Sequence, residues 1–148
     1  WTEIENGTWS IPAARMKMGR DHIVPLSRQA LAVLERLPRT SVYVLPMQKD
    51  DDRPMAANTV ADAIRKLGFE HTAHGFRATA RTILDELLNQ RVDLIEHQLA
   101  HAVKDANGRA YNRTAHLPAR KEMMQTWADY LDKLRIGAEV IPIRNATK

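Results

Sequence analysis

The sequence contains no cysteine among its 148 residues, which excludes disulfide bonds and metal sites built on thiolates. Aromatic residues are scarce, with three Trp, three Tyr and two Phe. No apolar run approaches the roughly 20 residues that a membrane-spanning helix requires. We find no internal repeat and no low-complexity segment. These absences predict a cytosolic protein that does not contact membranes.

The residues that are present suffice for one compact domain with a hydrophobic core. Hydrophobic residues make up 44% of the chain, and 148 residues leave little room for a second domain. The formal net charge of +4 favours an acidic partner, although many basic soluble domains bind no nucleic acid. Because aromatic side chains are few, contacts with such a partner would be made mainly to phosphates. The chain begins at Trp1 without a signal-peptide pattern, so we expect a piece of a longer protein.

The N-terminal residues have the pattern of a small antiparallel sheet. Asn6-Gly7 readily takes the positive φ angles of a two-residue hairpin turn. The extended runs on either side of it are residues 2–5 and 8–11. A second hairpin is expected between residues 9–15 and 22–26, with Lys17 near its tip. The pattern therefore predicts three antiparallel strands.

After this sheet, hydrophobic residues recur about every 3.6 positions, which is the period of amphipathic helices. The expected helices span residues 27–37, 58–67, 73–88, 93–99 and 118–134. Ser27 and Asn58 can cap the first two, and Pro118 suits the first turn of the last. The residues expected to face inward include Val60, Ile64, Leu67, Phe76, Ile83, Leu84, Leu87, Met123, Met124, Trp127, Tyr130, Leu131 and Leu134. The chain is thus predicted to be a mainly helical α+β domain with a small N-terminal three-stranded sheet.

The segment between the first two expected helices is polar in part. Residues 42–45 are expected to be extended, and residues 50–54 to form a polar loop. Three consecutive aspartates at positions 50–52 could bind a divalent ion, but a solvated loop is the simpler interpretation.

His74, Arg77 and Arg81 are spaced so that they project from one side of the third expected helix. This basic face begins in the first turn, where unpaired backbone N–H groups and the helix dipole favour an anion. Arg77 can offer two parallel hydrogen bonds to phosphate oxygens, a geometry that lysine does not match. The alternative is a solvated polar face without a ligand.

His97 and His101 lie four residues apart, a spacing that zinc ligands can use. However, no third ligand is obvious, and Glu96 precedes the first histidine, whereas the H-E-x-x-H motif has its glutamate after it. We therefore predict no metal site. His101 could instead join a site with Arg77, or close its helix as a C-terminal cap.

Three tyrosines could serve as a nucleophile. Tyr130 lies on the apolar stripe of the last helix and Tyr43 in an extended hydrophobic run, so both are interpreted as packing residues. Tyr111 follows a glycine-containing loop and is flanked by Arg109 and Arg113. This polar and basic setting favours a phenol that is presented to solvent.

Four segments follow one another along the chain: Met16-Lys17-Met18 with His22-Ile-Val-Pro-Leu-Ser27, His74-Gly-Phe-Arg77-Ala-Thr-Ala, Ile95-Glu-His-Gln-Leu-Ala-His101, and Ala110-Tyr111-Asn-Arg113. In this order and spacing they resemble the catalytic domain of prophage integrases of the tyrosine recombinase family. No single motif is specific, and the resemblance rests on their order. It extends from Trp1 to about Leu134.

The resemblance implies site-specific DNA strand exchange in prophage integration or excision, without a metal or nucleotide cofactor. Tyr111 would attack the scissile phosphate and form a 3′-phosphotyrosine. Arg77 and His101 would bind the oxygens on which negative charge develops. Lys17 would protonate the leaving 5′-oxygen, while His74 would assist proton movement or orient the phosphate. The residues expected to contact DNA around this site are Arg20, Arg81, Arg109 and Arg113.

The resemblance also implies parts that lie outside this sequence. Family members carry a further catalytic arginine in a helix before the first strand, and an N-terminal DNA-binding portion that completes a clamp around the duplex. We therefore expect residues 1–148 to be a fragment, a single integrase catalytic domain that binds DNA weakly and is nearly inert in cleavage. The fragment is expected to be a monomer, and the full-length protein a homotetramer on double-stranded DNA at its attachment sites.

In the family, the C-terminal segment docks onto a neighbouring protomer. Residues 137–148 would have this role here, and the alternative is that they fold back onto their own domain. Two other functions remain open, a catalytically silent DNA-binding prophage remnant or regulator and a topoisomerase-like enzyme with the same chemistry. The chain holds all five residues of the expected catalytic site, which argues against a pure binding module: Lys17, His74, Arg77, His101 and Tyr111. The expected location is the bacterial cytoplasm, on the nucleoid.

Overall fold

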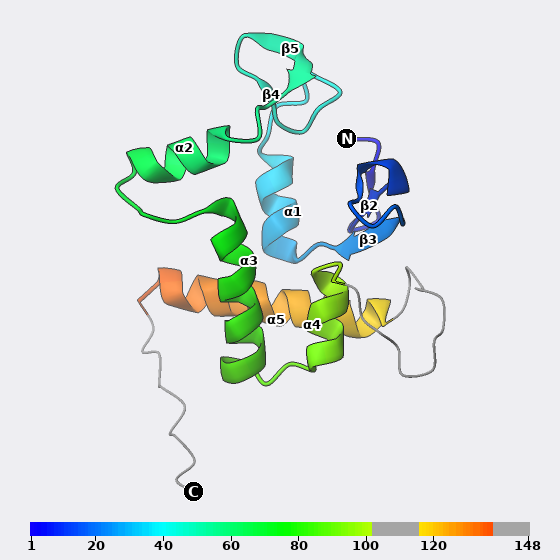
Figure 1. Cartoon of the computed structure of the whole chain (residues 1–148), viewed down its shortest axis with the longest axis vertical. Helices are drawn as coiled ribbons and strands as arrows, with labels where there is room; N and C mark the ends of the chain where they lie inside the picture. The colour runs from blue at the N-terminus through cyan, green and yellow to red at the C-terminus, as the bar shows by residue number, and fades with distance from the viewer. Residues whose placement is uncertain (102–115, 138–148) are drawn as a thin grey trace, which may run out of the picture.

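The structure, a computed structural model, describes residues 1–101 and 116–137 and begins with the predicted sheet (Figure 1). Strands β1 (Ile4–Glu5), β2 (Thr8–Ile11) and β3 (His22–Pro25) are antiparallel neighbours in that order. Asn6 and Gly7 have φ angles of 51° and 72°, so the first turn is the one that the Asn-Gly pair predicts. The three-stranded sheet is confirmed.

The connection between β2 and β3 is longer than predicted. β2 ends at Ile11 and not at residue 15, because Pro12 has no N–H with which to continue the strand pairing. A 3₁₀ turn, η1 (Ala13–Arg15), follows. The Ala13 backbone N–H donates a hydrogen bond to Asp21 Oδ1 at 2.9 Å, which joins the two ends of the connection.

Residues 50–54 form a strand, and the predicted polar loop is wrong. β4 (Pro46–Met47) and β5 (Asp50–Pro54) pair as an antiparallel hairpin apart from the first sheet (Figure 1). Aspartate has a low strand preference. However, the two-residue connection at positions 48–49 brings the segments together, and Ser41 Oγ donates a hydrogen bond to the Asp51 carbonyl at 2.5 Å. Residues 42–45, expected to be extended, lead into β4 as a series of bends.

Helix α1 (Arg28–Glu35) begins as predicted after Ser27, whose Oγ accepts a hydrogen bond from the Ala30 backbone N–H at 3.2 Å. It packs against the long helix α5 (Leu117–Arg135), whose first turn holds Pro118 as predicted. Within the two described ranges, no helix has both the length and the apolar character that crossing a membrane requires.

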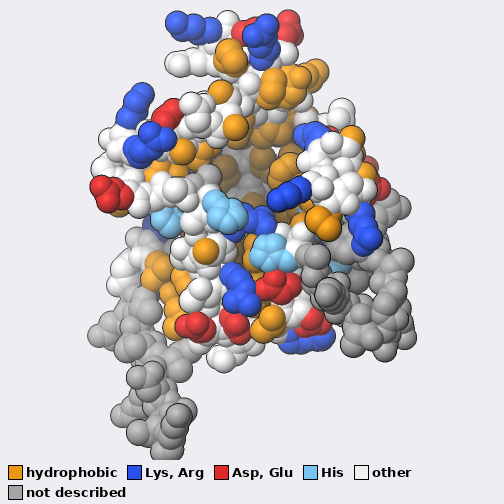
Figure 2. Space-filling model, viewed as in Figure 1, with side chains coloured by type: hydrophobic (Ala, Val, Ile, Leu, Met, Phe, Trp, Pro, Cys, Tyr) orange, Lys and Arg blue, Asp and Glu red, His pale blue; other side chains and the backbone are white. Residues whose placement is uncertain are grey.

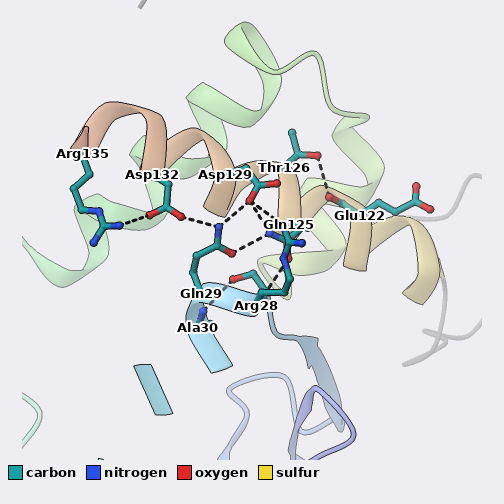
Figure 3. Close-up of polar contacts among 10 residues, drawn as sticks. Arg28, Gln29, Ala30, Glu122, Gln125, Thr126, Asp129, Asp132 and Arg135 are labelled. Carbon is teal, nitrogen blue, oxygen red and sulfur yellow. Dashed lines mark hydrogen bonds and ion pairs between the residues drawn. The ribbon is translucent and has the colours of Figure 1, made fainter. Parts of the chain in front are cut away.

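A polar network joins α1 to α5 (Figure 3). Gln29 Nε2 donates to Asp129 Oδ1 at 2.8 Å and to Asp132 Oδ2 at 2.9 Å. Gln125 Nε2 in turn donates to Gln29 Oε1 at 2.9 Å and to Asp129 Oδ1 at 2.8 Å. Because the bonds of Gln29 cross from α1 to α5 and each requires one relative placement of the two helices, the network specifies how they align.

Helix α2 (Thr59–Lys66) exists as predicted, but the prediction that its apolar side is buried is wrong. Val60 is 42% exposed and Leu67 73% exposed. The Asn58 side chain also makes no capping hydrogen bond. An amphipathic period leads to burial only where another element covers the apolar side. Figure 1 shows α2 projecting away from the other helices.

The third predicted helix forms and then changes its geometry. α3 (Ala73–Thr82) begins after Thr72, whose Oγ1 accepts a hydrogen bond from the Gly75 N–H at 2.9 Å. It continues into a π-helical turn, η2 (Ile83–Leu87). Phe76, expected inside, is 53% exposed, and its ring meets the His71 ring edge-on at 4.5 Å between centroids.

The hydrophobic core lies where η2, α4 (Val92–Gln98) and α5 meet. The side chains at its centre are at most 4% exposed and are those of Leu84, Leu94, Ile95 and Met123. Burial of each such side chain contributes about 1.5–3 kcal/mol. The second half of the predicted α5 stripe is not buried, because Leu131 and Leu134 are 42% and 40% exposed, beyond the core.

Candidate active site

Arg77 and His101, which are 24 positions apart in the sequence, lie side by side in the structure. Arg77 projects from α3, and its Nη2 donates a hydrogen bond to the Leu99 carbonyl at the end of α4. The same Nη2 lies 3.5 Å from His101 Nε2. Both residues are exposed, so a ligand can reach them from solvent.

A backbone turn at the end of α4 places His101 beside Arg77. Ala100 has a φ of 53°, and the Ala100 and His101 N–H groups donate to the carbonyls of His97 and Glu96 at 3.1 and 3.0 Å. This is a Schellman turn, in which the residue after the helix takes the left-handed conformation that glycine usually occupies. The His101 backbone therefore closes α4, while its side chain turns toward Arg77.

Glu96 is a site residue that the sequence analysis did not assign. Its Oε2 lies 2.5 Å from His101 Nδ1, and its Oε1 accepts a hydrogen bond from Arg81 Nε at 2.7 Å. Partial burial acts to raise the pKa of Glu96, but hydrogen bonds from His101 and Arg81 outweigh it and hold the pKa below its ordinary value. The only signal in the sequence is a carboxylate five residues before a histidine, which has meaning only once the turn is known.

The basic face predicted on α3 is divided in the structure. His74 is exposed, and no hydrogen bond or ion pair within the described residues holds it. Arg81 instead pairs with Glu96 at 2.7 Å and with Asp85 at 3.9 Å. Its charge is therefore directed to carboxylates of the same chain, which leaves Arg77 as the arginine of this face that is open to an anion. Figure 2 shows histidine side chains near the centre of the face in view, with Lys and Arg side chains close by.

The remaining predicted site residues lie either on the connection between β2 and β3 or outside the described ranges. Lys17 and Arg20 are exposed on the connection between β2 and β3, and in the described part of the chain no hydrogen bond or ion pair links Lys17 to Arg77 or His101. Three further residues lie outside the described ranges: Arg109, Tyr111 and Arg113.

Buried polar groups behind the site hold its elements together. His22 of β3 is 3% exposed, and its Nε2 lies 3.1 Å from the Gln98 carbonyl. Arg120 of α5 is completely buried and donates hydrogen bonds to Gln98 Oε1 at 2.7 Å and to the Ile23 carbonyl at 2.6 Å. Burial is the main cause that lowers the pKa of His22; the Gln98 bond opposes it and the charge of Arg120 reinforces it. Sequence reasoning missed Arg120, because an arginine near a helix start is usually solvated.

His97 and His101 do not share a site. His97 is 6% exposed and its ring lies 6.4 Å from that of His22, whereas His101 is exposed. Among residues 1–101 and 116–137, no three His, Cys, Asp or Glu side chains are grouped so that they could hold a metal ion. A cavity of about 190 Å³ lies between β1 and α1, lined in part by Trp1 and Leu34, and it includes none of the predicted site residues.

Comparison with known proteins identifies similar sequences. The phage integrase family model matches residues 1–117. Prophage integrase IntA of Escherichia coli strain K12 is 42% identical over 148 residues, covering 95% of this chain and 36% of that protein. Integrase of Enterobacteria phage P4 is 40% identical, and the match covers 91% of this chain and 36% of that protein. Prophage integrase IntZ of Escherichia coli strain K12 is 39% identical, and the match covers 93% of this chain and 35% of that protein. The chain thus spans about a third of the length of these curated relatives. No solved structure matches it.

Proposed function

This chain belongs to the phage integrase family, and we propose that it is the strand-cleaving part of a tyrosine-type site-specific DNA recombinase that integrates or excises a prophage. The observation that carries the proposal is the exposed pair of Arg77 and His101, with Arg77 Nη2 3.5 Å from His101 Nε2. A guanidinium and an imidazole at this separation can bind oxygens of one phosphodiester. Such binding stabilises the charge that develops when a nucleophile attacks the phosphorus.

The proposed reaction is a transfer of the phosphoryl group to a tyrosine and back to DNA. The Tyr111 hydroxyl attacks the scissile phosphorus, the bond to the 5′-oxygen breaks, and a 3′-phosphotyrosine forms. A 5′-hydroxyl of another strand then displaces Tyr111, so one phosphate ester replaces another at each step. Arg77 and His101 stabilise the non-bridging oxygens. Lys17 donates the proton to the leaving oxygen, and His74 orients the phosphate or assists the proton transfer.

The proposed partner is double-stranded DNA, which the full-length protein would bind as a homotetramer in the bacterial cytoplasm. Arg20, Arg109 and Arg113 are proposed to contact backbone phosphates, so affinity should fall steeply as salt concentration rises. We withdraw this role from Arg81, because Glu96 already engages its guanidinium. We propose that the 148 residues alone are a monomer with little cleavage activity, and that residues 137–148 dock onto a neighbouring protomer in the tetramer.

An assay for a covalent adduct tests the proposed function. The full-length gene product is incubated with nicked suicide duplexes that carry candidate attachment sites, and adducts are detected after denaturation. We expect an adduct that Tyr111→Phe abolishes. Tyr130→Phe is the matched control, because the Tyr130 ring stacks on Trp127 in α5 at 6.2 Å between centroids, and this variant should still form the adduct.

Other outcomes of the same assay identify the alternatives. DNA binding without an adduct on any candidate site would support a catalytically silent DNA-binding remnant. An adduct that forms on any duplex, together with relaxation of supercoiled DNA, would support a topoisomerase-like enzyme. Either result would contradict site-specific recombination.

A further inference from the structure

We propose that Glu96 is a positioning residue that sets both the orientation and the tautomer of the His101 imidazole. Glu96 Oε2 lies 2.5 Å from His101 Nδ1. An ionised carboxylate can only accept hydrogen bonds, so Nδ1 carries the proton. The ring consequently presents Nε2 on its other side, toward Arg77.

Arg77 favours the same tautomer from the opposite side of the ring. Its Nη2 lies 3.5 Å from His101 Nε2, and a guanidinium can only donate hydrogen bonds. The partner that suits Arg77 is therefore an Nε2 without a proton. Two charged groups from different helices thus select the Nδ1–H form, which is the less common tautomer of free histidine in water.

Arg81 holds the Glu96 carboxylate in place. Arg81 Nε donates to Glu96 Oε1 at 2.7 Å, while the other carboxylate oxygen faces His101. The Glu96 side chain is 22% exposed, compared with 44% for each of its two partners. Since both oxygens are engaged in a partly buried place, the carboxylate has little freedom to rotate away from His101. The lowered pKa of Glu96 is consistent with a carboxylate that stays ionised.

The consequence for catalysis rests on the proposed function. If His101 binds a phosphate oxygen beside Arg77, its Nε2 must face the substrate, and Glu96 ensures that it does. Protonation adds an N–H at Nε2 and leaves the bond from Nδ1 to Glu96 intact, so the ring can then donate to a phosphate oxygen. Hydrogen-bond partners that orient a metal-ligating histidine change activity about 10- to 100-fold when removed, and we expect a loss of the same order for the partner of His101.

Nuclear magnetic resonance of the histidine side chains tests the tautomer without any catalysis. The 148-residue chain is labelled with ¹⁵N-histidine, long-range ¹H–¹⁵N correlations are recorded at mildly alkaline pH, and the His101 signals are identified by their loss in His101→Gln. We expect the Nδ1–H form in the wild type and in Glu96→Gln, whose amide oxygen can still accept the bond. Glu96→Ala should shift His101 to the Nε2–H form or to a mixture.

The matched control is Asp93→Ala, which removes another carboxylate of α4; its partners are Arg91 at 2.6 Å and His116 at 3.9 Å. It should leave the His101 signals unchanged. An Nε2–H form of His101 in the wild type would overturn the proposal, and this result does not depend on whether a Glu96 variant folds. An unchanged tautomer in a folded Glu96→Ala chain would overturn it as well.

Cleavage by the full-length protein tests the catalytic consequence. We expect Glu96→Ala to slow adduct formation about 10- to 100-fold, with Glu96→Gln retaining most of the rate. Equal rates for the wild type and Glu96→Ala would refute the positioning role in catalysis. No adduct with the wild type would refute the proposed function instead, while the tautomer result would still stand.

Discussion

Replacing the buried Arg120 by methionine should destabilise the fold by about 3 kcal/mol, because two carbonyl oxygens lose their donors. Arg120 Nε and Nη2 lie 3.0 and 2.7 Å from Gln98 Oε1, and Nη2 lies 2.6 Å from the Ile23 carbonyl. A buried acceptor left without a partner costs about 1–3 kcal/mol, so the two sum to roughly 2–6 kcal/mol. We expect the lower half of this range, since methionine removes a buried charge and Gln98 is close enough to the surface to bind water.

Urea unfolding followed by circular dichroism measures this effect. With a urea dependence of about 1.5 kcal/mol per molar, a loss of about 3 kcal/mol lowers the midpoint by about 2 M. Arg135→Met is the control on the same helix, because Arg135 is exposed and its pair with Asp132 at 3.2 Å should contribute less than about 1 kcal/mol. Adding Gln98→Met to Arg120→Met should recover part of the loss, because one orphaned acceptor disappears. A change for Arg120→Met no larger than that of the control would refute the reasoning.

Two further predictions concern the residues around the candidate site. Ala100→Gly should raise the free energy of unfolding by about 0.5–1 kcal/mol. Alanine is strained in the left-handed conformation at φ 53°, and the strain energy that glycine removes exceeds the entropic cost of ordering a glycine. The same urea titration checks this prediction, and a lower midpoint would contradict the Schellman turn. The pKa of His22 lies below its ordinary value of 6.5, chiefly through burial, so the unfolded chain binds this proton first as pH falls. Stability from His22 is therefore present above about pH 6.5 and is lost below it. His22→Gln, which keeps a donor for Gln98, should lose less stability than the wild type between pH 7.5 and 5.5, and equal losses would disprove this account.

Features that depend on neighbouring residues could be predicted from the sequence. The turn at Asn6-Gly7, the cap at Ser27 and the early proline at Pro118 all appear where expected, because each rests on the conformational preference of one or two residues. The family could also be predicted, since the order of short motifs along a chain requires no coordinates.

Predictions that needed a neighbour from elsewhere in the chain were less successful. The apolar period of α2 is real, but Leu67 is exposed because no described element covers it. Asp50–Pro54 is a strand because a facing segment pairs with it, against the preference of aspartate. Periodicity indicates which side of an element is apolar and carries no information on what lies against that side.

For the candidate site, the sequence by itself determined which chemical groups are available: an arginine on one helix and a histidine after another. Only the tertiary structure decided how they are used. It places His101 between Arg77 and Glu96, and it directs Arg81 to Glu96, away from the open face that its helical spacing predicted. The physical reason is that hydrogen bonds and ion pairs depend on distances of about 3 Å, whereas the spacing of residues along a chain does not specify which distant groups come within that distance.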